Sequence, residues 1–107
     1  MLIEDIAWSA GIYEGEGNCK LVTFKNKHAP RKYIRPTIVV SSTDLDVLEK
    51  LKRLWGGSIW AVKKWNPKSK KQLYYWTLTF RKARNFVSAI YPYLMERRKK
   101  QLQIIFN

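Results

Sequence analysis

Two segments of the chain alternate between side chains of two kinds, and this alternation predicts strands that bury one face. Residues 33–41 alternate between an apolar set and a set with polar groups: Ile34, Pro36, Ile38 and Val40 against Tyr33, Arg35, Thr37 and Val39. Residues 73–80 alternate similarly: Tyr74, Trp76, Leu78 and Phe80 against Tyr75, Thr77 and Thr79. Because successive side chains of a strand point to opposite faces, each segment has one face for a core and one for solvent or a ligand.

Helical patterns separate the strands and complete the architecture. Helices are expected over residues 3–15 and 45–55, and two more around 86–94 and 95–106, with a break near Pro92. Further strands are expected over residues 18–26 and 58–64. The order αββ, αββ, αα predicts an α+β fold, in which a four-stranded antiparallel sheet carries helices on one face, in a single domain of residues 1–107.

Two local features of this pattern make specific predictions. Thr43 and Asp46 have the spacing of a capping box at the start of the second helix, and the pair Gly56–Gly57 is expected to end it. Pro36 has no N–H to donate, which predicts an edge position or a bulge in its strand.

Positive charge is concentrated in two stretches that contain no acid. The formal net charge is +13, and residues 17–43 and 50–95 hold lysines and arginines but no aspartate or glutamate. Such stretches repel themselves unless a polyanion neutralises them. Nucleic acid is the usual polyanion, since phosphate contacts release counterions. The remaining interpretation is a basic protein that is merely soluble.

Other classes of protein are disfavoured by the composition. No apolar run reaches the roughly 18–20 residues that a membrane span requires. Cys19 is the single cysteine, so an intrachain disulfide is impossible. Glu4 and Asp5 stand where a signal peptide would carry basic residues. We therefore expect no membrane partner and an intracellular location, in the cytoplasm, nucleoid or an organelle matrix, rather than secretion.

Small residues recur along one side of the first helix. Ala7, Gly11 and Gly15 are spaced by four residues, with Ala10 alongside. This spacing places them on one helical face, where another helix backbone can approach closely. Because the chain has one such helix, we expect the partner to come from a second copy in a two-fold dimer. The alternative is a tight helix crossing inside the monomer.

Two acids, Glu14 and Glu16, stand at the end of this helix and directly before the basic stretch. They could be ordinary solvated side chains. A carboxylate that faces DNA phosphates is unfavourable unless a cation lies between them, and Mg²⁺ binds carboxylate and phosphate oxygens. Two copies that meet along the small residues would bring two Glu16 side chains together, where paired metals can activate water and stabilise a leaving oxygen.

Residues 9–17 resemble the nine-residue LAGLIDADG motif: Ser9-Ala10-Gly11-Ile12-Tyr13-Glu14-Gly15-Glu16-Gly17. The αββαββ order and the segment Tyr91-Pro92-Tyr93-Leu94 before a basic helix are similar to the same family, so the resemblance covers nearly the whole chain. It implies the fold of the single-motif LAGLIDADG homing endonucleases. It also implies their activity, in which a homodimer makes a double-strand break in a long, pseudo-palindromic DNA site with Mg²⁺ or Mn²⁺.

The resemblance also implies roles for particular residues. Glu16 would be a metal ligand, together with the backbone carbonyl of Gly15. Arg97 would stabilise phosphate or position water. Ser42 takes the place of a polar residue that is often glutamine in the family, and as a shorter side chain it would act only through water. The motif also begins with Ser9 rather than leucine, and its acid at position 16 is glutamate rather than aspartate.

The polar strand face and the loops are expected to contact DNA. Base contacts are expected from Arg35, Thr37, Tyr75 and Thr77, with Tyr33 on the same face and Lys20 on a strand of ambiguous alternation. Phosphate contacts are expected from lysines, although each could equally be solvated surface: Lys27, Lys32, Lys63, Lys64, Lys68, Lys70 and Lys71. Core positions are expected for Trp55, Trp60 and Trp76, whereas Trp65 could stack on an unpaired base.

Two other functions compete with the endonuclease. A catalytically inactive relative, such as an intron maturase that binds intron RNA or a DNA-binding regulator, would keep the small residues and the basic surface but need no acid at Glu16. An unrelated basic RNA-binding protein would need no acids at the end of a glycine-lined helix. The presence of Glu16 favours the enzyme.

Overall fold

The computed structural model describes residues 1–25, 32–63 and 71–106. The order of elements is the predicted one: α1 (Ile3–Glu16), β1 (Gly17–Lys25), β2 (Lys32–Ser42), α2 (Leu45–Trp55), β3 (Ser58–Ala61), β4 (Tyr74–Thr79), α3 (Phe80–Ile90), the 3-10 turn η1 (Tyr91–Tyr93) and α4 (Glu96–Phe106). The third strand ends at Ala61, earlier than expected. Within the described ranges, no helix has the length and apolar character needed to cross a membrane.

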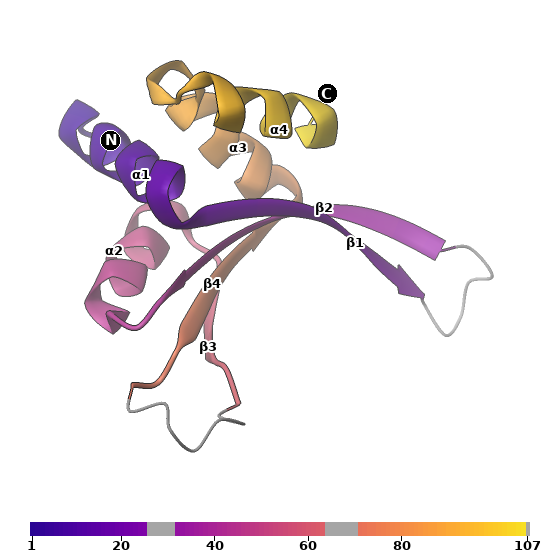
Figure 1. Ribbon diagram of the computed structural model, residues 1–107, viewed down its shortest axis with the longest axis horizontal. Helices are drawn as coiled ribbons and strands as arrows, with labels where there is room; N and C mark the ends of the chain where they lie inside the picture. Colours follow the sequence, from indigo (N-terminus) through magenta and orange to yellow (C-terminus); the bar gives the residue numbers. More distant parts are fainter. Residues whose placement is uncertain (26–31, 64–70, 107) are drawn as a thin grey trace.

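The four strands form one antiparallel sheet in the order β1-β2-β4-β3. Two hairpins, β1–β2 and β3–β4, are joined through the pairing of β2 with β4, which stops at Thr37 and Thr79. Pro36 lies one position beyond this stop, so its missing N–H interrupts no bond to β4, and the predicted edge position is confirmed. Beyond it the β1–β2 hairpin extends past the rest of the sheet (Figure 1).

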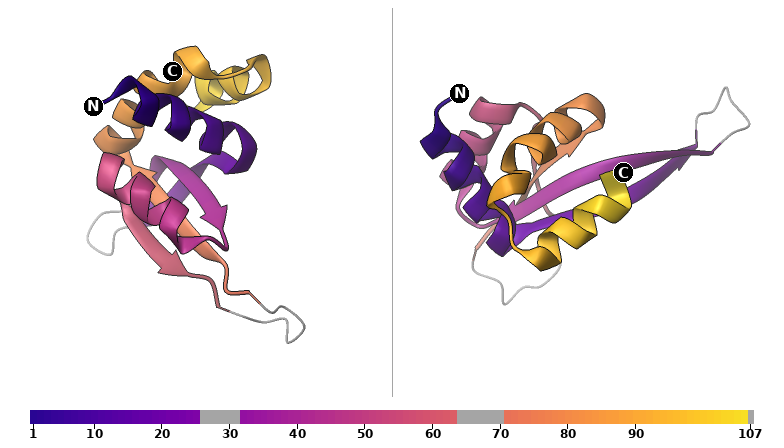
Figure 2. Two further views of the ribbon diagram at one scale, coloured as in Figure 1. Left: turned by 90° about the vertical axis from the view of Figure 1, so that its left-hand side faces the viewer. Right: turned by 90° about the horizontal axis from the view of Figure 1, so that it is seen from above.

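The helices lie on one face of the sheet, as predicted, and the opposite face is left open (Figure 1, Figure 2). The core is formed where Ile38 and Val40 of β2 and Trp76 and Leu78 of β4 point toward the helices, and all four are buried. Phe86 of α3 is at its centre, in edge-to-face contact with the rings of three aromatic residues: Tyr13, Trp55 and Trp76. Burial of each such side chain stabilises the fold by about 1.5–3 kcal/mol.

The start of α2 differs from the expected capping box. The helix begins at Leu45, so Asp44 is its N-cap residue, and no side chain caps the helix at this end. Asp46 instead accepts the neighbouring backbone N–H of Val47 at 3.0 Å, and the Asp44 N–H donates to Ser42 Oγ at 2.9 Å. The capping-box prediction was wrong because the helix starts one residue later than that spacing requires.

The end of α2 requires glycine, as expected. Gly56 and Gly57 have φ angles of 84° and 91°, in the left-handed region that disfavours side chains. The carbonyl oxygen of Gly56 accepts the indole N–H of Trp76 at 2.8 Å. A Cβ added to Gly57 would lie 2.4 Å from the carbonyl oxygen of Thr77. The turn therefore brings α2 against β4 at a distance that no side chain permits.

We expect Gly57→Ala to lower the free energy of unfolding by at least about 2 kcal/mol, because backbone strain and the clash with Thr77 act together. Urea unfolding at one protein concentration measures the change. The neighbouring exposed residue provides a control, since Ser58→Ala should shift stability by no more than about 0.5 kcal/mol. Equal stability of both variants would contradict the close approach of the turn to β4.

Candidate active site and nucleic-acid interface

Three of the four small residues of α1 form an exposed stripe. Ala7, Gly11 and Gly15 are exposed, and a Cβ added at either glycine would meet no atom of a neighbouring element within 4 Å. The alternative of a tight crossing inside the monomer is therefore excluded for these glycines. Ile3, four residues before Ala7 and 69% exposed, extends the stripe with a large apolar side chain. The stripe is a free apolar surface in the isolated chain.

The prediction that Ala10 belongs to this surface was wrong. Ala10 is 2% exposed and packs in the core with Tyr13. The reason is geometric, because Ala10 shares the sheet-facing side of the helix with Ile6 and Tyr13, at four- and three-residue spacing.

Ser9, which departs from the motif, connects α1 to α2. Its side chain is fully buried, and its Oγ donates to the carbonyl oxygen of Asp5 at 2.7 Å. The same oxygen accepts the indole N–H of Trp55 at 2.9 Å, so both polar groups are satisfied. A leucine at this position could not accept that hydrogen bond, and Trp55, which is partly buried against Phe86, explains the serine.

The two acids at the end of α1 have different surroundings, and Glu14 holds α4 in place. Its Oε1 accepts the backbone N–H of Met95 at 2.6 Å, just before α4 begins. Arg98 of α4 reaches back, donating from Nε to the Glu14 carbonyl oxygen at 3.2 Å and pairing with Oε2 at 3.7 Å. The Arg98 guanidinium also lies 5.6 Å from the centre of the Tyr13 ring. Glu14 is therefore a structural residue.

Burial raises the pKa of the Tyr13 phenol well above its usual range, and the neighbouring Cys19 thiol acts in the same direction. The phenol therefore stays neutral beneath Arg98. Cys19 is partly buried against the core.

Glu16, the last residue of α1, is exposed, and within the described ranges its carboxylate has no hydrogen-bond or ion-pair partner. It lines a pocket of about 390 Å³ between the ends of α1 and β2, together with side chains that carry oxygen: Ser41, Ser42, Thr43 and Asp44. The structure thus brings Glu16 and Ser42 together, as expected. Asp44 was not among the site residues predicted from the sequence, although it lies two residues after Ser42.

The carboxylate and hydroxyl oxygens of this pocket are of the kind that a hard divalent cation binds, and the rest of its lining is apolar: Ile12, Val40, Val47 and Leu73. Among the described residues, no group of three or more His, Cys, Asp or Glu side chains gathers in one place. A cation at Glu16 would consequently need further ligands from the backbone, a phosphate or a second chain.

Of the two adjacent arginines in α4, Arg97 is exposed, whereas Arg98 is mostly buried against α1. Arg97 does not line the Glu16 pocket in the isolated chain.

Replacing each of the two arginines by alanine compares their contributions to stability. We expect Arg98→Ala to lower the free energy of unfolding by about 1–2 kcal/mol, since it removes a hydrogen bond and a cation–π contact. Arg97→Ala should change it by less than about 0.5 kcal/mol. If urea unfolding shows that both variants lose the same free energy of unfolding, Arg98 is not the structural residue of the two.

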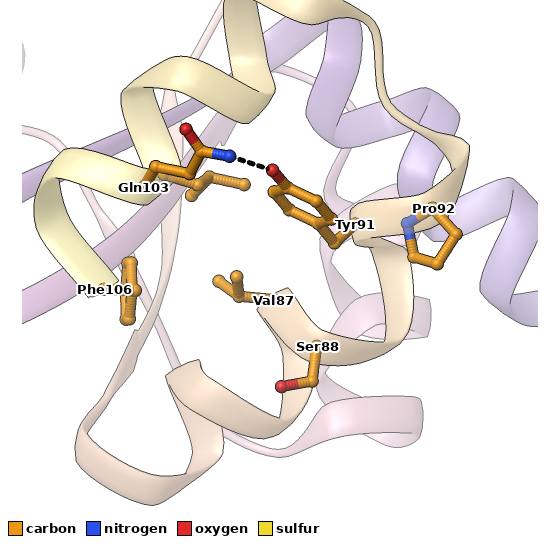
Figure 3. A pocket seen from close by; sticks show the side chains of 7 residues that line it. Val87, Ser88, Tyr91, Pro92, Gln103 and Phe106 are labelled. Atoms are coloured by element: carbon orange, nitrogen blue, oxygen red, sulfur yellow. Dashed lines mark hydrogen bonds between the residues drawn. The ribbon is translucent and has the colours of Figure 1, made fainter.

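A second pocket, of about 370 Å³, lies between α3 and α4 and is lined by uncharged side chains (Figure 3). In it, Gln103 donates to the hydroxyl of Tyr91, so the polar groups that meet there satisfy one another. Without a carboxylate or a cation, this pocket has no group suited to phosphodiester chemistry.

The open face of the sheet carries the polar side chains whose alternation predicted it. The pairing of Lys20 with Thr37 places β1 in the same alternation, and the pairing of Val39 with Thr77 does the same for β4. We call this surface the polar face, and its described residues are Asn18, Lys20, Val22, Arg35, Thr37, Val39, Ser41, Ser58, Trp60, Tyr75, Thr77 and Thr79. Lys20, which was ambiguous from the sequence, is exposed on this face. Arg35, Tyr75 and Thr77 are partly exposed on it.

The structure contradicts two predictions on this face. Thr37 is 4% exposed, and its hydroxyl donates to the carbonyl oxygen of Arg35 at 3.2 Å, so it is not available to a base in this structure. Its small side chain is covered because it lies in the middle of the sheet, between Lys20 and Thr79. Trp60, expected in the core, is half exposed on the polar face instead.

The predicted phosphate contacts are only partly within the described ranges. Lys63 and Lys71 are exposed beside the β3–β4 hairpin, where the Val62 N–H donates to the Leu73 carbonyl oxygen. Of Lys32 and Tyr33 the structure describes the backbone, which is part of β2. Outside the described residues lie Lys27, Lys64, Lys68, Lys70 and the aromatic Trp65.

The chain is similar to solved structures of homing endonucleases in complex with DNA. I-CvuI, in complex with the I-CreI target in the presence of Mg, superposes with a TM-score of 0.74 at 15% identity, over 97% of this chain and 66% of that one. I-GzeII, a LAGLIDADG homing endonuclease with its DNA target, gives 0.68 at 21% identity, over 94% and 33%. The archaeal intron-encoded I-Vdi141I, complexed with DNA, gives 0.68 at 18%, over 92% and 63%.

The present chain thus spans about two-thirds or less of the length of these endonucleases. Its sequence matches no protein-family model and no curated protein. The likeness is one of structure, and it covers every helix and strand from α1 to α4. With the αββαββ order, the antiparallel sheet and the exposed small residues of α1 in place, the protein has the fold of the LAGLIDADG homing endonucleases.

Proposed function

We propose that the protein is a site-specific DNA endonuclease, formed by two copies of a single domain of residues 1–107, that cuts both strands of a long pseudo-palindromic duplex. The observation that carries the proposal is Glu16. It is an exposed carboxylate without a partner in the described residues, in a chain of net charge +13, at the end of a helix whose outer side is lined by small residues. The three similar structures described above are homing endonucleases in complex with DNA.

In the proposed dimer, two α1 helices meet along Ala7, Gly11 and Gly15, whose lack of bulk lets the backbones approach closely. Because α1 ends at Glu16, a two-fold axis along this contact delivers one Glu16 from each chain to the same region, one acid for each DNA strand. The polar faces of the two chains then form one continuous basic surface for the duplex. Lys20, Arg35, Tyr75 and Thr77 face the base edges, and Lys63 and Lys71 neutralise phosphates.

A divalent cation, Mg²⁺ or Mn²⁺, would be held by Glu16 and the Gly15 carbonyl, and when bound it supplies an activated water and a Lewis acid for the leaving oxygen. The other residues act around it. Arg97, exposed in the first turn of α4, provides a positive charge for the phosphate. Ser42 lines the pocket of Glu16 and holds water, since its hydroxyl is too short to reach across. Glu14 and Arg98 keep the end of α1 in register with α4.

A catalytically inactive relative, such as an intron maturase or a DNA-binding regulator, is the second candidate. Ser42 favours it, because this short side chain stands where the LAGLIDADG resemblance implies a residue that is often glutamine. Its hydroxyl also already accepts the N–H of Asp44.

Selection of cleaved duplexes from a randomised library, with Mg²⁺ present, separates the two. We expect a long consensus with two related half-sites and loss of cleavage when the metal is chelated. A library that is bound with a consensus but never cut would support the inactive relative. Absence of any duplex binding would overturn the endonuclease and the DNA-binding regulator.

A further inference from the structure

Trp60 is a large aromatic side chain on the face of the sheet that is turned away from the core. The pairing of Trp60 with Tyr75, next to that of Ile59 with buried Trp76, places the two aromatics on the polar face together. Trp60 is 50% exposed. Exposing so much of an indole forgoes the stabilisation that burial of an aromatic side chain provides. The contact of Trp60 with its cross-strand neighbour Tyr75 leaves half of the tryptophan side chain open to a ligand.

The exposed ring is held in a defined position. The centres of the Trp60 and Tyr75 rings are 5.0 Å apart, and the planes meet at 86°, the edge-to-face arrangement that aromatic pairs favour. Tyr75 is only partly exposed and belongs to β4, a strand between two others. Trp60 thus projects from the edge strand β3 with its ring against Tyr75, and this contact restricts its conformational freedom before any ligand binds.

The chemistry of the Trp60 side chain matches that of one base. An indole ring offers a large apolar surface and one N–H donor, with no acceptor, and within the described ranges the Trp60 N–H has no partner. In the major groove, thymine is the base that presents a methyl group next to an acceptor oxygen. Cytosine presents a donor there, and guanine and adenine carry no methyl group.

We propose that Trp60, supported by Tyr75, recognises a thymine in the major groove of each half-site through its C5 methyl group. This inference rests on the proposed function, since it requires a duplex on the polar face, but it does not require cleavage. The inference gives Trp60, on the edge strand β3, a part in base recognition. From the sequence, base contacts were expected only from residues with polar groups.

Selections for binding test the proposal first, with EDTA present so that the strands stay intact. We expect the wild-type protein to enrich thymine at one position of each half-site, and the Trp60→Ala variant to lose that enrichment while it keeps the rest of the consensus. A matched control removes another exposed apolar side chain, Ile104 of α4, which lies in the helical layer. Ile104→Ala should give the wild-type consensus.

A methyl-deletion experiment then isolates the contact. In the selected duplex, each thymine of one half-site is replaced in turn by deoxyuridine, which lacks only the methyl group. At one position we expect the wild-type Kd to rise about fourfold, the loss that corresponds to one buried methyl group. Trp60→Ala should bind the thymine and deoxyuridine duplexes equally at that position, and Trp60→Phe should keep the discrimination because it keeps an apolar ring. Thermal unfolding checks that the variants remain folded.

The outcomes separate this inference from the proposed function. If Trp60→Ala still distinguishes thymine from deoxyuridine wherever the wild-type protein does, or if the wild-type protein distinguishes them at no position, the recognition of thymine by Trp60 is wrong. The proposed endonuclease function is still supported in that case if the protein binds a specific duplex and cuts it. If Trp60→Ala removes the discrimination of thymine from deoxyuridine but no duplex is cut, the inference about Trp60 is confirmed and the proposed endonuclease function is wrong. If the wild-type protein binds no duplex, both are wrong.

Discussion

Replacing Glu16 by glutamine should abolish cleavage while the protein still binds its duplex. The amide keeps the shape of the side chain but removes the charge that attracts a divalent cation, so we expect the single-turnover cleavage rate to fall by at least about 10³-fold. Binding should be equal or tighter, because one carboxylate no longer faces the phosphates. Cleavage assays with Mg²⁺, together with Kd measured in EDTA, give both quantities.

Loss of a negative charge elsewhere provides the control for this variant. Glu49 is an exposed acid of α2, and Glu49→Gln changes the net charge by the same amount as Glu16→Gln. It should cleave like the wild-type protein. If Glu16→Gln also cleaves at the wild-type rate, the exposed carboxylate of α1 has no part in the chemistry, and the proposed metal site is wrong.

The Gly11→Leu variant should separate the two copies of the chain. In the isolated protein a Cβ at Gly11 meets no atom of a neighbouring element within 4 Å, and leucine favours a helix over glycine by about 0.5–1 kcal/mol. The monomer should therefore be as stable as before or more so. In the proposed dimer the same side chain holds the two backbones apart, and we expect the dimer Kd to rise at least about 100-fold, equivalent to roughly 3 kcal/mol.

Sedimentation equilibrium measures this Kd, and urea unfolding reports the stability of the chain. A leucine placed on another exposed helical position serves as the control. Asn85 of α3 is exposed and does not belong to the small-residue stripe of α1, so Asn85→Leu should leave the dimer intact. An assembly state that Gly11→Leu does not alter would show that the stripe of α1 is not the dimer contact, and Glu16 would then lack its counterpart from a second chain.

Local sequence patterns anticipated much of the fold. Alternation at residues 33–41 and 73–80 identified β2 and β4 and the sides of Ile38, Val40, Trp76 and Leu78, because burial on one face is a property of each strand by itself. The pair Gly56–Gly57 marked the end of α2 because positive φ angles favour glycine, and this preference depends only on the local backbone. The pairing of Glu16 with Ser42 in one pocket followed from the LAGLIDADG resemblance.

Other assignments failed where neighbours in space decided the outcome. Thr37 has the alternation of a base contact, yet it is buried between its partners on the two neighbouring strands, Lys20 and Thr79. Trp60 has a large apolar side chain of the kind that is usually buried, yet its pairing with Tyr75 places it on the polar face of the sheet. Ala10 shares the small size of the stripe but faces the sheet. The difference between Arg97 and Arg98 depends on where the start of α4 meets the end of α1, which no spacing within α4 reveals.

By itself, the sequence determined the order and periodicity of the elements, the concentration of positive charge, and the position of one acid at the end of a glycine-lined helix, since all of these are properties of residues close together in the chain. Only the tertiary structure decided which polar side chains remain open to a ligand, because exposure depends on strand register and helix crossing between segments far apart in the chain.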